Sequence, residues 1–445
     1  MINFQSSTPI EILRERSQDN WLVNYDHEKL LQLTEEFLTE YSHSQPQKII
    51  LSESDPMMFL ARFIAAVSSN NYVFLGNPTW GSLEWQQAFS LIETDLNTDK
   101  NFSQSLIMIP TGGSSGKIRF AIHTWQTLTS SITGFCQYFL LKEVNSFCVL
   151  PLYHVSGLMQ FMRSFISRGK LVITPFRELK TDHWCDFPPE DFFISLVPTQ
   201  LQALLSQEKF IPWLAKFKTV LLGGAPSWSD LIQTAKQHNI PLSPCYGMTE
   251  TASQVITLKP EKFLQGDTSN GQILPHARIK IVDEQGRELA ANQTGKVTII
   301  AASLALGYYP ELFPPQTPLC TDDLGYLDEQ ENLHLVGRHS DKIITGGENV
   351  FPLEIEAAIR STNLVADVTV LGREDTYWGQ IICAVYIPNY PSVEHQQIKI
   401  ALEGKIAKYK QPKIWFKVDN FPRNAQGKVN KSKLKEILTT SRKSN

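Results

Sequence analysis

The sequence lacks long apolar runs, and it has few cysteines. No stretch approaches the roughly 18 consecutive apolar residues that a membrane-spanning helix requires, so we expect no membrane span. The N-terminal residues include neither a basic region nor an apolar segment, and no secretory signal is visible. The six cysteines include no Cys-x-x-Cys pair and lie at Cys136, Cys148, Cys185, Cys245, Cys320 and Cys383. This scatter argues against a zinc site and indicates reduced, mostly buried thiols in a cytoplasmic protein.

The sequence also lacks a strong charge imbalance. Its 41 Lys and Arg residues against 45 Asp and Glu residues give a net charge of −4, which argues against a general nucleic-acid binder. Residues 404–445 are the exception, because they contain twelve Lys and Arg residues against Asp419 and Glu436. This run is either a solvated surface and tail or part of a domain that meets a polyanionic ligand.

With 445 residues, the chain is too long for one ordinary hydrophobic core, so two or more domains are expected. Short apolar runs predict strands at 48–52, 72–75, 147–150, 171–174, 192–197 and 219–222. Helical patterns between them fall at 56–68, 124–141 and 157–167. The alternation predicts a mainly parallel sheet of the α/β class. From about residue 270 to 336, short strands separated by Gly, Asn and Asp turns predict a smaller β-rich subdomain.

A domain boundary is expected near residue 340. Beyond it the pattern reads helix, strand, strand, helix and strand, over 352–361, 368–371, 381–387, 393–407 and 414–418. A compact α+β unit of about 100 residues is an ordinary domain size. The predicted architecture is therefore a large α/β domain with a β-rich subdomain over residues 1–339, followed by a small α+β domain over residues 340–445.

The most informative segment is residues 110–119, Pro-Thr-Gly-Gly-Ser-Ser-Gly-Lys-Ile-Arg, which follows an apolar run. Glycines let backbone N–H groups approach an anion closely, and hydroxyl and basic side chains add donors. This chemistry suits the phosphates of a nucleotide. The P-loop spacing is absent, because Thr111 stands five residues before Gly116 and Ile118 follows Lys117. Taken alone, a segment rich in Gly and Ser is more often a plain surface loop.

Four further segments carry turn glycines or carboxylates where strands should end, at residues 221–226, 246–251, 321–325 and 337–341. Ligands of open α/β sheets bind beyond the carboxyl ends of the strands. Asp323 could accept hydrogen bonds from both hydroxyls of a ribose, and Arg338 could bind ribose or phosphate. Each segment is weak alone, because turns use Gly, Asp and Ser everywhere.

The order of the motifs resembles that of the adenylate-forming enzymes, which include acyl- and aryl-CoA ligases, luciferases and the adenylation domains of peptide synthetases. The matching motifs are Thr-Gly-Gly-Ser-Ser-Gly at 111–116, Leu-Tyr-His-Val-Ser-Gly at 152–157, Gly-Gly-Ala-Pro at 223–226, Tyr-Gly-Met-Thr-Glu at 246–250, Thr-Asp-Asp at 321–323, Gly-Arg-x-x-Asp at 337–341 and Pro-Arg-Asn-Ala-Gln-Gly-Lys at 422–428. The resemblance covers about residues 48–436. It implies that a carboxylate attacks the α-phosphate of Mg-ATP. The small, mobile domain then rotates, and the thiol of CoA displaces AMP.

The resemblance also implies a role for each matching position. The residues that would contact phosphate or Mg²⁺ are Thr111, Gly112, Gly113, Ser114, Ser115, Gly116, Arg119, Thr249 and Glu250. Those that would hold adenine and ribose are Gly224, Ala225, Pro226, Tyr246, Asp323 and Arg338. Lys428 would reach the α-phosphate and the substrate carboxylate, and Ser340 matches the hinge position. His154 would border the acyl pocket, unless it only satisfies a helix end.

Two positions depart from the family pattern. Ile118 and Arg119 stand where the family usually has Pro-Lys. Arg119 can still pair with phosphate, although its planar fork differs from an ammonium, and Lys117 is an alternative partner. Thr321-Asp322-Asp323 replaces the usual Thr-Gly-Asp. The register assigns the ribose contact to Asp323, with Asp322 as the alternative.

Within the family, residues 246–254 and 340–352 look like those of the o-succinylbenzoate–CoA ligases of menaquinone and phylloquinone synthesis, and residues 151–158 are similar too. Such a substrate has two carboxylates, of which one is activated and the other must be held by polar or cationic groups. Arg163 is the candidate for that role, unless it is a helix-surface arginine. Ser253 and Gln254 would add hydrogen bonds or simply cap the next element.

The expected partners are thus a small-molecule carboxylate, ATP with Mg²⁺, and CoA, while the oligomeric state is left open. Two other functions fit the same motifs. One is another aryl- or fatty-acyl-CoA ligase, although a long fatty chain would favour an apolar tunnel without Arg163. The other is a non-catalytic nucleotide-binding protein of the same fold, which the intact set of Glu250, Asp323, Arg338 and Lys428 disfavours.

Overall fold

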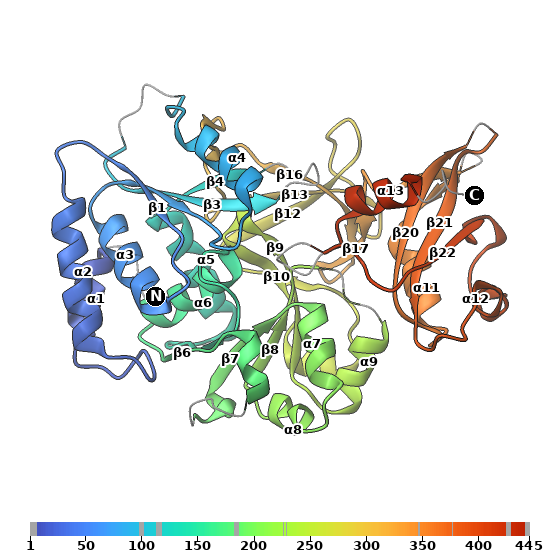
Figure 1. The fold of residues 1–445 in the computed structure, drawn as a ribbon, viewed down its shortest axis with the longest axis horizontal. Coiled ribbons are helices and arrows are strands. Elements are labelled where there is room, and N and C mark those ends of the chain that lie inside the picture. The colour runs from blue at the N-terminus through green and yellow to red at the C-terminus, as the bar shows by residue number, and fades with distance from the viewer. Residues whose placement is uncertain are drawn as a thin grey trace.

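The structure is a computed structural model that describes residues 7–97, 102–112, 118–181, 187–225, 227, 229–345, 348–375, 377–423 and 429–440. Three β-sheets organise these residues, and helices cover them (Figure 1). Two helices at the N-terminal end, α1 (Pro9–Glu15) and α2 (His27–Tyr41), pack against the helix α3 (Pro56–Ser68). No helix in these ranges is both long enough and apolar enough to cross a bilayer.

The first sheet has the strand order β1-β2-β3-β4-β14-β15. Its strands are β1 (Lys48–Leu51), β2 (Tyr72–Leu75), β3 (Leu106–Gly112), β4 (Ile118–Thr124), β14 (Gly307–Tyr308) and β15 (Glu311–Leu312). Alternate residues of a strand point to opposite faces. Accordingly Ile107 and Ile109 pack with α3 (Pro56–Ser68), whereas Leu106 and Met108 pack with α4 (Ser82–Ile92). The sheet is therefore buried on both faces.

The second sheet has eleven strands in the order β12-β13-β16-β17-β11-β10-β9-β8-β7-β5-β6. Its parallel half comprises β5 (Asn145–Cys148), β6 (Leu171–Ile173), β7 (Phe192–Leu196), β8 (Thr219–Leu222) and β9 (Leu242–Met248). Its antiparallel half comprises β10 (Ser253–Thr257), β11 (Gly271–Ile273), β12 (Ala277–Val282), β13 (Gly295–Ala301), β16 (Leu319–Leu327) and β17 (Asn332–Arg338). The β-rich region expected after residue 270 thus extends the α/β sheet.

Helices cover both faces of the parallel half. On one face lie α5 (Trp125–Phe139) and α6 (Val155–Ile166). On the other lie α7 (Pro198–Leu205), α8 (Phe210–Ala215) and α9 (Ser229–Gln237), while α10 (Pro260–Gln265) adds to the same core. The α/β class expected from the alternating pattern is confirmed.

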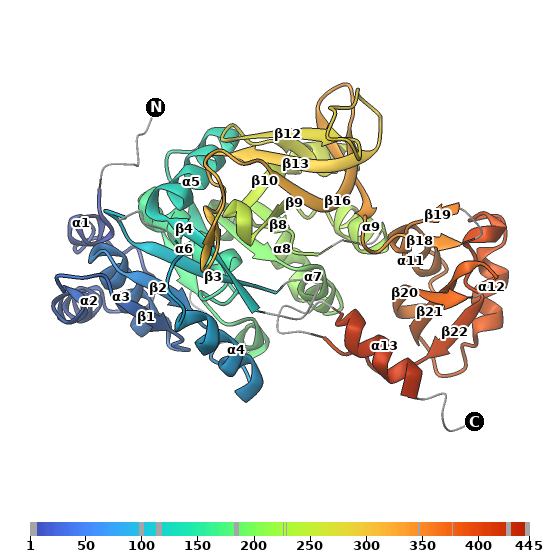
Figure 2. The same ribbon diagram turned by 90° about the horizontal axis from the view of Figure 1, so that it is seen from above.

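A third sheet and its helices form the C-terminal domain, at the end of the molecule opposite α1 and α2 (Figures 1 and 2). Its elements are β18 (Ile343–Thr345), β19 (Glu348–Val350), β20 (Val365–Asp375), β21 (Gly379–Pro388), β22 (Ile414–Lys417), α11 (Pro352–Arg360), α12 (His395–Leu402) and α13 (Lys431–Thr440). It has a hydrophobic core of its own, which includes Ile355, Val370 and Ile398. The small α+β domain is as expected, and its boundary at residue 340 stays a prediction.

Two local features differ from the expectations. The helix expected at 124–141 is present as α5, but a strand that was not predicted, β4, precedes it and pairs antiparallel with β3, so that the glycine-rich loop joins the two strands. Because Phe120 to Thr124 are all buried, β4 lacks the alternating pattern that would have revealed it. The helix expected over 393–407 ends at Leu402, close to Gly404, whose φ of 77° is left-handed.

Candidate active site

Tyr246, Asp323 and Arg338 form one hydrogen-bonded cluster on three strands of the second sheet. The Tyr246 hydroxyl donates to Asp323 Oδ2 at 2.8 Å, and Arg338 Nε donates to Asp323 Oδ1 at 3.1 Å. Asp323 on β16 is the direct cross-strand partner of Arg338 on β17. Burial and the Asp323 charge raise the pKa of Tyr246, so its phenol stays a neutral donor. The structure thus brings together three residues that the sequence analysis assigned to adenine and ribose.

Asp322 and Asp323 have different surroundings. Asp322 Oδ1 accepts a hydrogen bond from the Ser340 backbone N–H at 3.2 Å, and the Ser340 hydroxyl donates to Asp322 Oδ2. Neighbouring residues of a strand point to opposite faces, which separates the two carboxylates. The geometry therefore favours Asp323 for the nucleotide and connects Asp322 with the predicted hinge residue.

Glu250 belongs to a second cluster, which reaches the strands beside the glycine-rich loop. It lies in the short 3₁₀ helix Thr249–Thr251 that follows β9, and it is buried. The Tyr308 hydroxyl donates to Glu250 Oε1 at 2.6 Å, and the Arg119 guanidinium carbon lies 4.2 Å from the centre of the Tyr308 ring. Thr111 on β3 pairs directly with Arg119 on β4. Tyr308 therefore links Arg119 with Glu250, and Thr111 lies beside Arg119 in the sheet, so three predicted phosphate or metal contacts come together.

Thr249 is held by a buried histidine. His123 Nε2 donates to the Thr249 carbonyl oxygen at 2.8 Å, and His123 Nδ1 lies 3.0 Å from the Thr127 hydroxyl. Burial lowers the pKa of His123 to about 4, so the ring is neutral near pH 7. His123 and Tyr308 were not among the predicted site residues, because neither lies in a motif and both belong to strands that were not predicted.

Glu250 is the buried carboxylate that the described residues of these clusters offer to a magnesium ion. Within those residues no group of three or more His, Cys, Asp or Glu side chains is placed to hold a metal. Magnesium commonly binds through one or two carboxylates together with substrate phosphates. Glu250 fits that arrangement, because Tyr308 occupies only its Oε1 atom in the hydrogen bond.

Arg163, Ser253 and Gln254 form a third cluster. Arg163 lies on α6 and is only 3% exposed, so the surface alternative is wrong. Its Nη2 atom donates to Gln254 Oε1 at 2.6 Å and to Ser253 Oγ at 3.0 Å, and its guanidinium carbon lies 4.4 Å from the centre of the Phe135 ring. Burial lowers its pKa to about 10, which leaves it charged at neutral pH. No carboxylate pairs with it within the described ranges.

Other predicted residues lie apart from these clusters. His154 precedes α6, its Nε2 atom is buried without a partner in the described residues, and burial lowers its pKa to about 4. Gly224 has a φ of 81° in the turn after β8, and Ala225 follows it. The predicted residues that lie outside the described ranges are Gly113, Ser114, Ser115, Gly116, Pro226 and Lys428.

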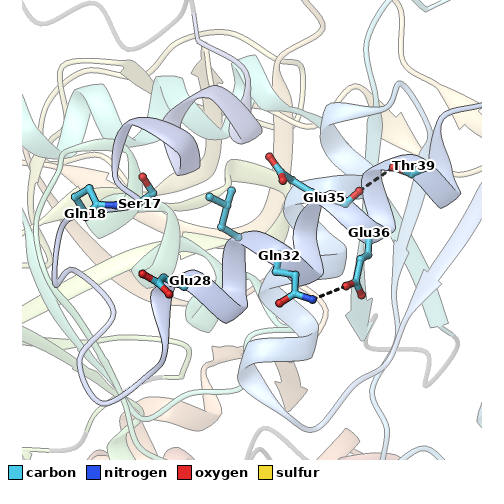
Figure 3. A pocket seen from close by; sticks show the side chains of 8 residues that line it. Ser17, Gln18, Glu28, Gln32, Glu35, Glu36 and Thr39 are labelled. Carbon is cyan, nitrogen blue, oxygen red and sulfur yellow. Dashed lines mark hydrogen bonds between the residues drawn. The ribbon is translucent and has the colours of Figure 1, made fainter.

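A surface groove of about 490 Å³ lies between α2 and the segment that follows α1, and it contains none of the predicted site residues (Figure 3). It is lined by Ser17, Gln18, Glu28, Leu31, Gln32, Glu35, Glu36 and Thr39. Within it, Gln32 donates to Glu36 at 2.9 Å. The groove is therefore separate from the three clusters of predicted site residues.

The fold is a mixed α/β fold with a large N-terminal domain and a C-terminal domain, and the predicted nucleotide contacts that lie in described residues gather mainly in the first two clusters. Residues 37–309 match the AMP-binding enzyme family, and residues 354–428 match the AMP-binding enzyme C-terminal domain. The chain belongs to the AMP-binding enzyme family.

Among curated relatives, the 2-succinylbenzoate–CoA ligase of Enterococcus faecalis is 33% identical over 327 residues, which are 72% of this chain and 67% of the relative. That of Listeria monocytogenes is 31% identical over 353 residues, 77% of this chain and 72% of the relative. Among solved structures, o-succinylbenzoate CoA synthetase from Bacillus subtilis, in complex with its acyl-adenylate intermediate, superposes with a TM-score of 0.80 at 24% identity, covering 95% of this chain and 97% of that one. The superposition with this solved structure supports the fold.

Proposed function

We propose that this protein is an AMP-forming acid–thiol ligase that joins o-succinylbenzoate (2-succinylbenzoate) to CoA in menaquinone or phylloquinone synthesis, at the expense of ATP. The choice of a substrate with two carboxylates rests on Arg163, a buried guanidinium without an anionic partner in the described residues. A buried charge is unfavourable unless an opposite charge accompanies it. A substrate with a second carboxylate supplies that charge, and the curated relatives act on such a substrate.

The nucleotide would occupy the region between the first two clusters. Asp323 accepts from the ribose hydroxyls, and Arg338 keeps the Asp323 carboxylate oriented. Arg119 and the glycine-rich loop hold phosphate oxygens. Glu250 would hold Mg²⁺, which neutralises phosphate charge when it is bound. His123 fixes the Thr249 carbonyl, so the Thr249 hydroxyl is presented from a rigid segment.

The acyl substrate would have one carboxylate at the α-phosphate and the other at Arg163. The first carboxylate displaces pyrophosphate and forms the acyl-adenylate, a much better acyl donor than the free acid. Lys428 neutralises the negative charge that accumulates around the α-phosphate in the transition state. His154, neutral because of its burial, borders the acyl chain and adds no charge there.

The second step requires a different pose of the C-terminal domain. The thiol of CoA attacks the acyl carbon, the thioester forms, and AMP leaves. One arrangement would complement both transition states poorly, so a rotation about Ser340 serves the two steps in turn. A cytoplasmic location, expected from the scattered cysteines, stays a prediction.

A carboxylate panel in an ATP–pyrophosphate exchange assay tests the proposal. We expect o-succinylbenzoate to support exchange far better than benzoate or a fatty acid. Formation of its CoA thioester, measured by mass spectrometry, should require ATP, Mg²⁺ and CoA together. Equal exchange with benzoate would exclude a dicarboxylate substrate, and ATP binding without exchange would favour a non-catalytic protein.

A further inference from the structure

His276 is a buried histidine to which the proposed mechanism gives no role. It lies between β11 and β12, and its ring packs against Gly134 in the middle of α5. A Cβ atom placed on Gly134 would lie 1.9 Å from His276 Nδ1, so the ring occupies the space of the missing side chain. Both ring nitrogens are buried, and neither has a hydrogen-bond partner in the described part of the chain.

Such an arrangement is costly for the protein without a ligand. A neutral imidazole has one N–H donor and one acceptor nitrogen. Leaving either of them buried and unpaired costs about 1–3 kcal/mol. Glycine inside a helix costs about 1 kcal/mol relative to alanine. Packing alone is a poor reason for both costs, since an apolar ring would fill the same space without unpaired nitrogens.

Contacts along α5 put His276 next to the Arg163 cluster. Phe135, the residue after Gly134, supplies the ring on which the Arg163 guanidinium lies. Ser131, one turn earlier, donates to the carbonyl oxygen of Ala252 at 2.8 Å, immediately before Ser253. Burial, together with the positive charge of Arg163, lowers the pKa of His276 to about 4. The turn of α5 that receives the His276 ring therefore also carries the contacts to Arg163 and to the residue that precedes β10, the strand of Gln254.

The unpaired atoms around this point share one chemistry. Arg163 Nε and Gln254 Nε2 are also buried without partners in the described residues, and both are N–H donors. A neutral histidine adds one more donor. Several donors around one positive charge suit a carboxylate, which offers two oxygens and about four acceptor positions.

We propose that His276 is a specificity-determining residue that donates a hydrogen bond to the second carboxylate of the acyl substrate, beside Arg163 and Gln254. This inference rests on the proposed function and adds a residue that lies outside every recognised motif. Gly134 serves it as a positioning residue, because only glycine leaves room for the ring.

The test compares His276→Phe and His276→Gln with the unchanged protein. ATP–pyrophosphate exchange gives KM and kcat for o-succinylbenzoate. Two analogues, phenyl-substituted 4-oxobutanoate (β-benzoylpropionate) and 2-propanoylbenzoate, each lack one carboxylate, and their affinities report binding without it. We expect His276→Phe to raise the KM for o-succinylbenzoate about tenfold and to leave the KM for ATP within about twofold. The affinity for the analogue that lacks the second carboxylate should also stay within about twofold, because that analogue cannot accept the hydrogen bond. His276→Gln, which keeps an N–H donor, should recover part of the loss.

Thr298→Val is the matched control, because Thr298 Oγ1 is also a buried atom without a partner in the described residues but lies on β13, outside the clusters. It should leave the KM for o-succinylbenzoate unchanged. Gly134→Ala keeps the histidine but displaces its ring, and it should match the loss of His276→Phe even though alanine favours the helix. In the double variant with His276→Phe, the two losses should not add.

An unchanged KM for o-succinylbenzoate in a folded His276→Phe protein would overturn the inference. So would equal weakening of o-succinylbenzoate and both analogues, because that result indicates a general packing defect. If His276→Phe does not fold, the same criteria apply to His276→Gln and Gly134→Ala. Failure of the proposed function is a separate result, in which the unchanged protein itself does not prefer o-succinylbenzoate to the analogues.

Discussion

The two clusters proposed for the nucleotide, around Asp323 and Glu250, differ from the cluster proposed for the acyl substrate, around Arg163, in how their charges are satisfied. Asp323 accepts hydrogen bonds from Tyr246 and Arg338, and Glu250 accepts one from Tyr308. Arg163, by contrast, is buried beside neutral side chains, and its Nε atom has no partner in the described residues. The nucleotide side is therefore ordered by its own hydrogen bonds before a ligand arrives. The proposed acyl side carries a positive charge and donors without partners among the described residues, and an anionic ligand would satisfy both.

The largest expected effect comes from Lys428, which lies outside the described residues and tests whether the ordered nucleotide side is sufficient without it. Lys428→Ala should reduce adenylate formation by about 100-fold or more, a loss of about 2.7 kcal/mol, because the charge at the α-phosphate is no longer neutralised. The same variant, supplied with synthetic acyl-adenylate and CoA, should form thioester at nearly the normal rate. Ser340→Pro is the matched opposite, with adenylate formed and CoA transfer stalled. Equal damage to both steps by Lys428→Ala would exclude a rotating domain.

Arg163→Ala addresses the acyl side directly. Loss of the only cation in that cluster should lower kcat/KM for o-succinylbenzoate about 30-fold or more, since truncating a buried charge partner costs about 2–5 kcal/mol. The KM for ATP should stay the same. Arg163→Lys keeps the charge without the planar fork, so its kcat/KM should lie between those of the unchanged protein and Arg163→Ala. If KM for ATP rose as much as KM for the acid, the two regions would not be independent.

Asp323→Ala and Asp322→Ala form a matched pair on β16. Asp323→Ala should raise the KM for ATP about tenfold, because the ribose hydroxyls lose an acceptor and Arg338 loses its partner. Asp322→Ala should leave the KM for ATP unchanged and alter the balance of the two half-reactions, because Asp322 contacts Ser340. Exchange assays at varied ATP concentration measure the first effect. The reverse pattern would show that Asp322 is the ribose contact.

The smallest expected effect is that of Tyr308→Phe. The variant loses one hydrogen bond to Glu250 but keeps the ring beneath Arg119. Removing such a bond costs about 1 kcal/mol, so we expect about a fivefold rise in the Mg²⁺ concentration needed for half-maximal exchange. Tyr309→Phe is a suitable control, because the Tyr309 hydroxyl donates to the Thr94 carbonyl instead. An equal effect of both variants would remove Tyr308 from the site.

Most of the fold could be predicted, because periodic patterns report burial. The expected helix at 56–68 and the expected strands at 72–75 and 219–222 coincide with α3, β2 and β8. The strand β4 was missed because burial on both faces removes the alternation of apolar and polar residues. His123 was missed for the same reason, since it lies on β4. Tyr308 and His276 lie outside the motifs, so no local pattern in a single sequence marks them.

The sequence by itself determined the α/β class and the candidate residues that the ordered motifs contain. Tertiary structure decided which of these residues meet. It directed Asp323 toward Tyr246 and Asp322 toward Ser340, and it buried Arg163 between α5 and β10. The reason is physical: spacing along the chain sets local conformation, whereas a side chain's partners come from strands and helices far apart in sequence, which only packing brings together.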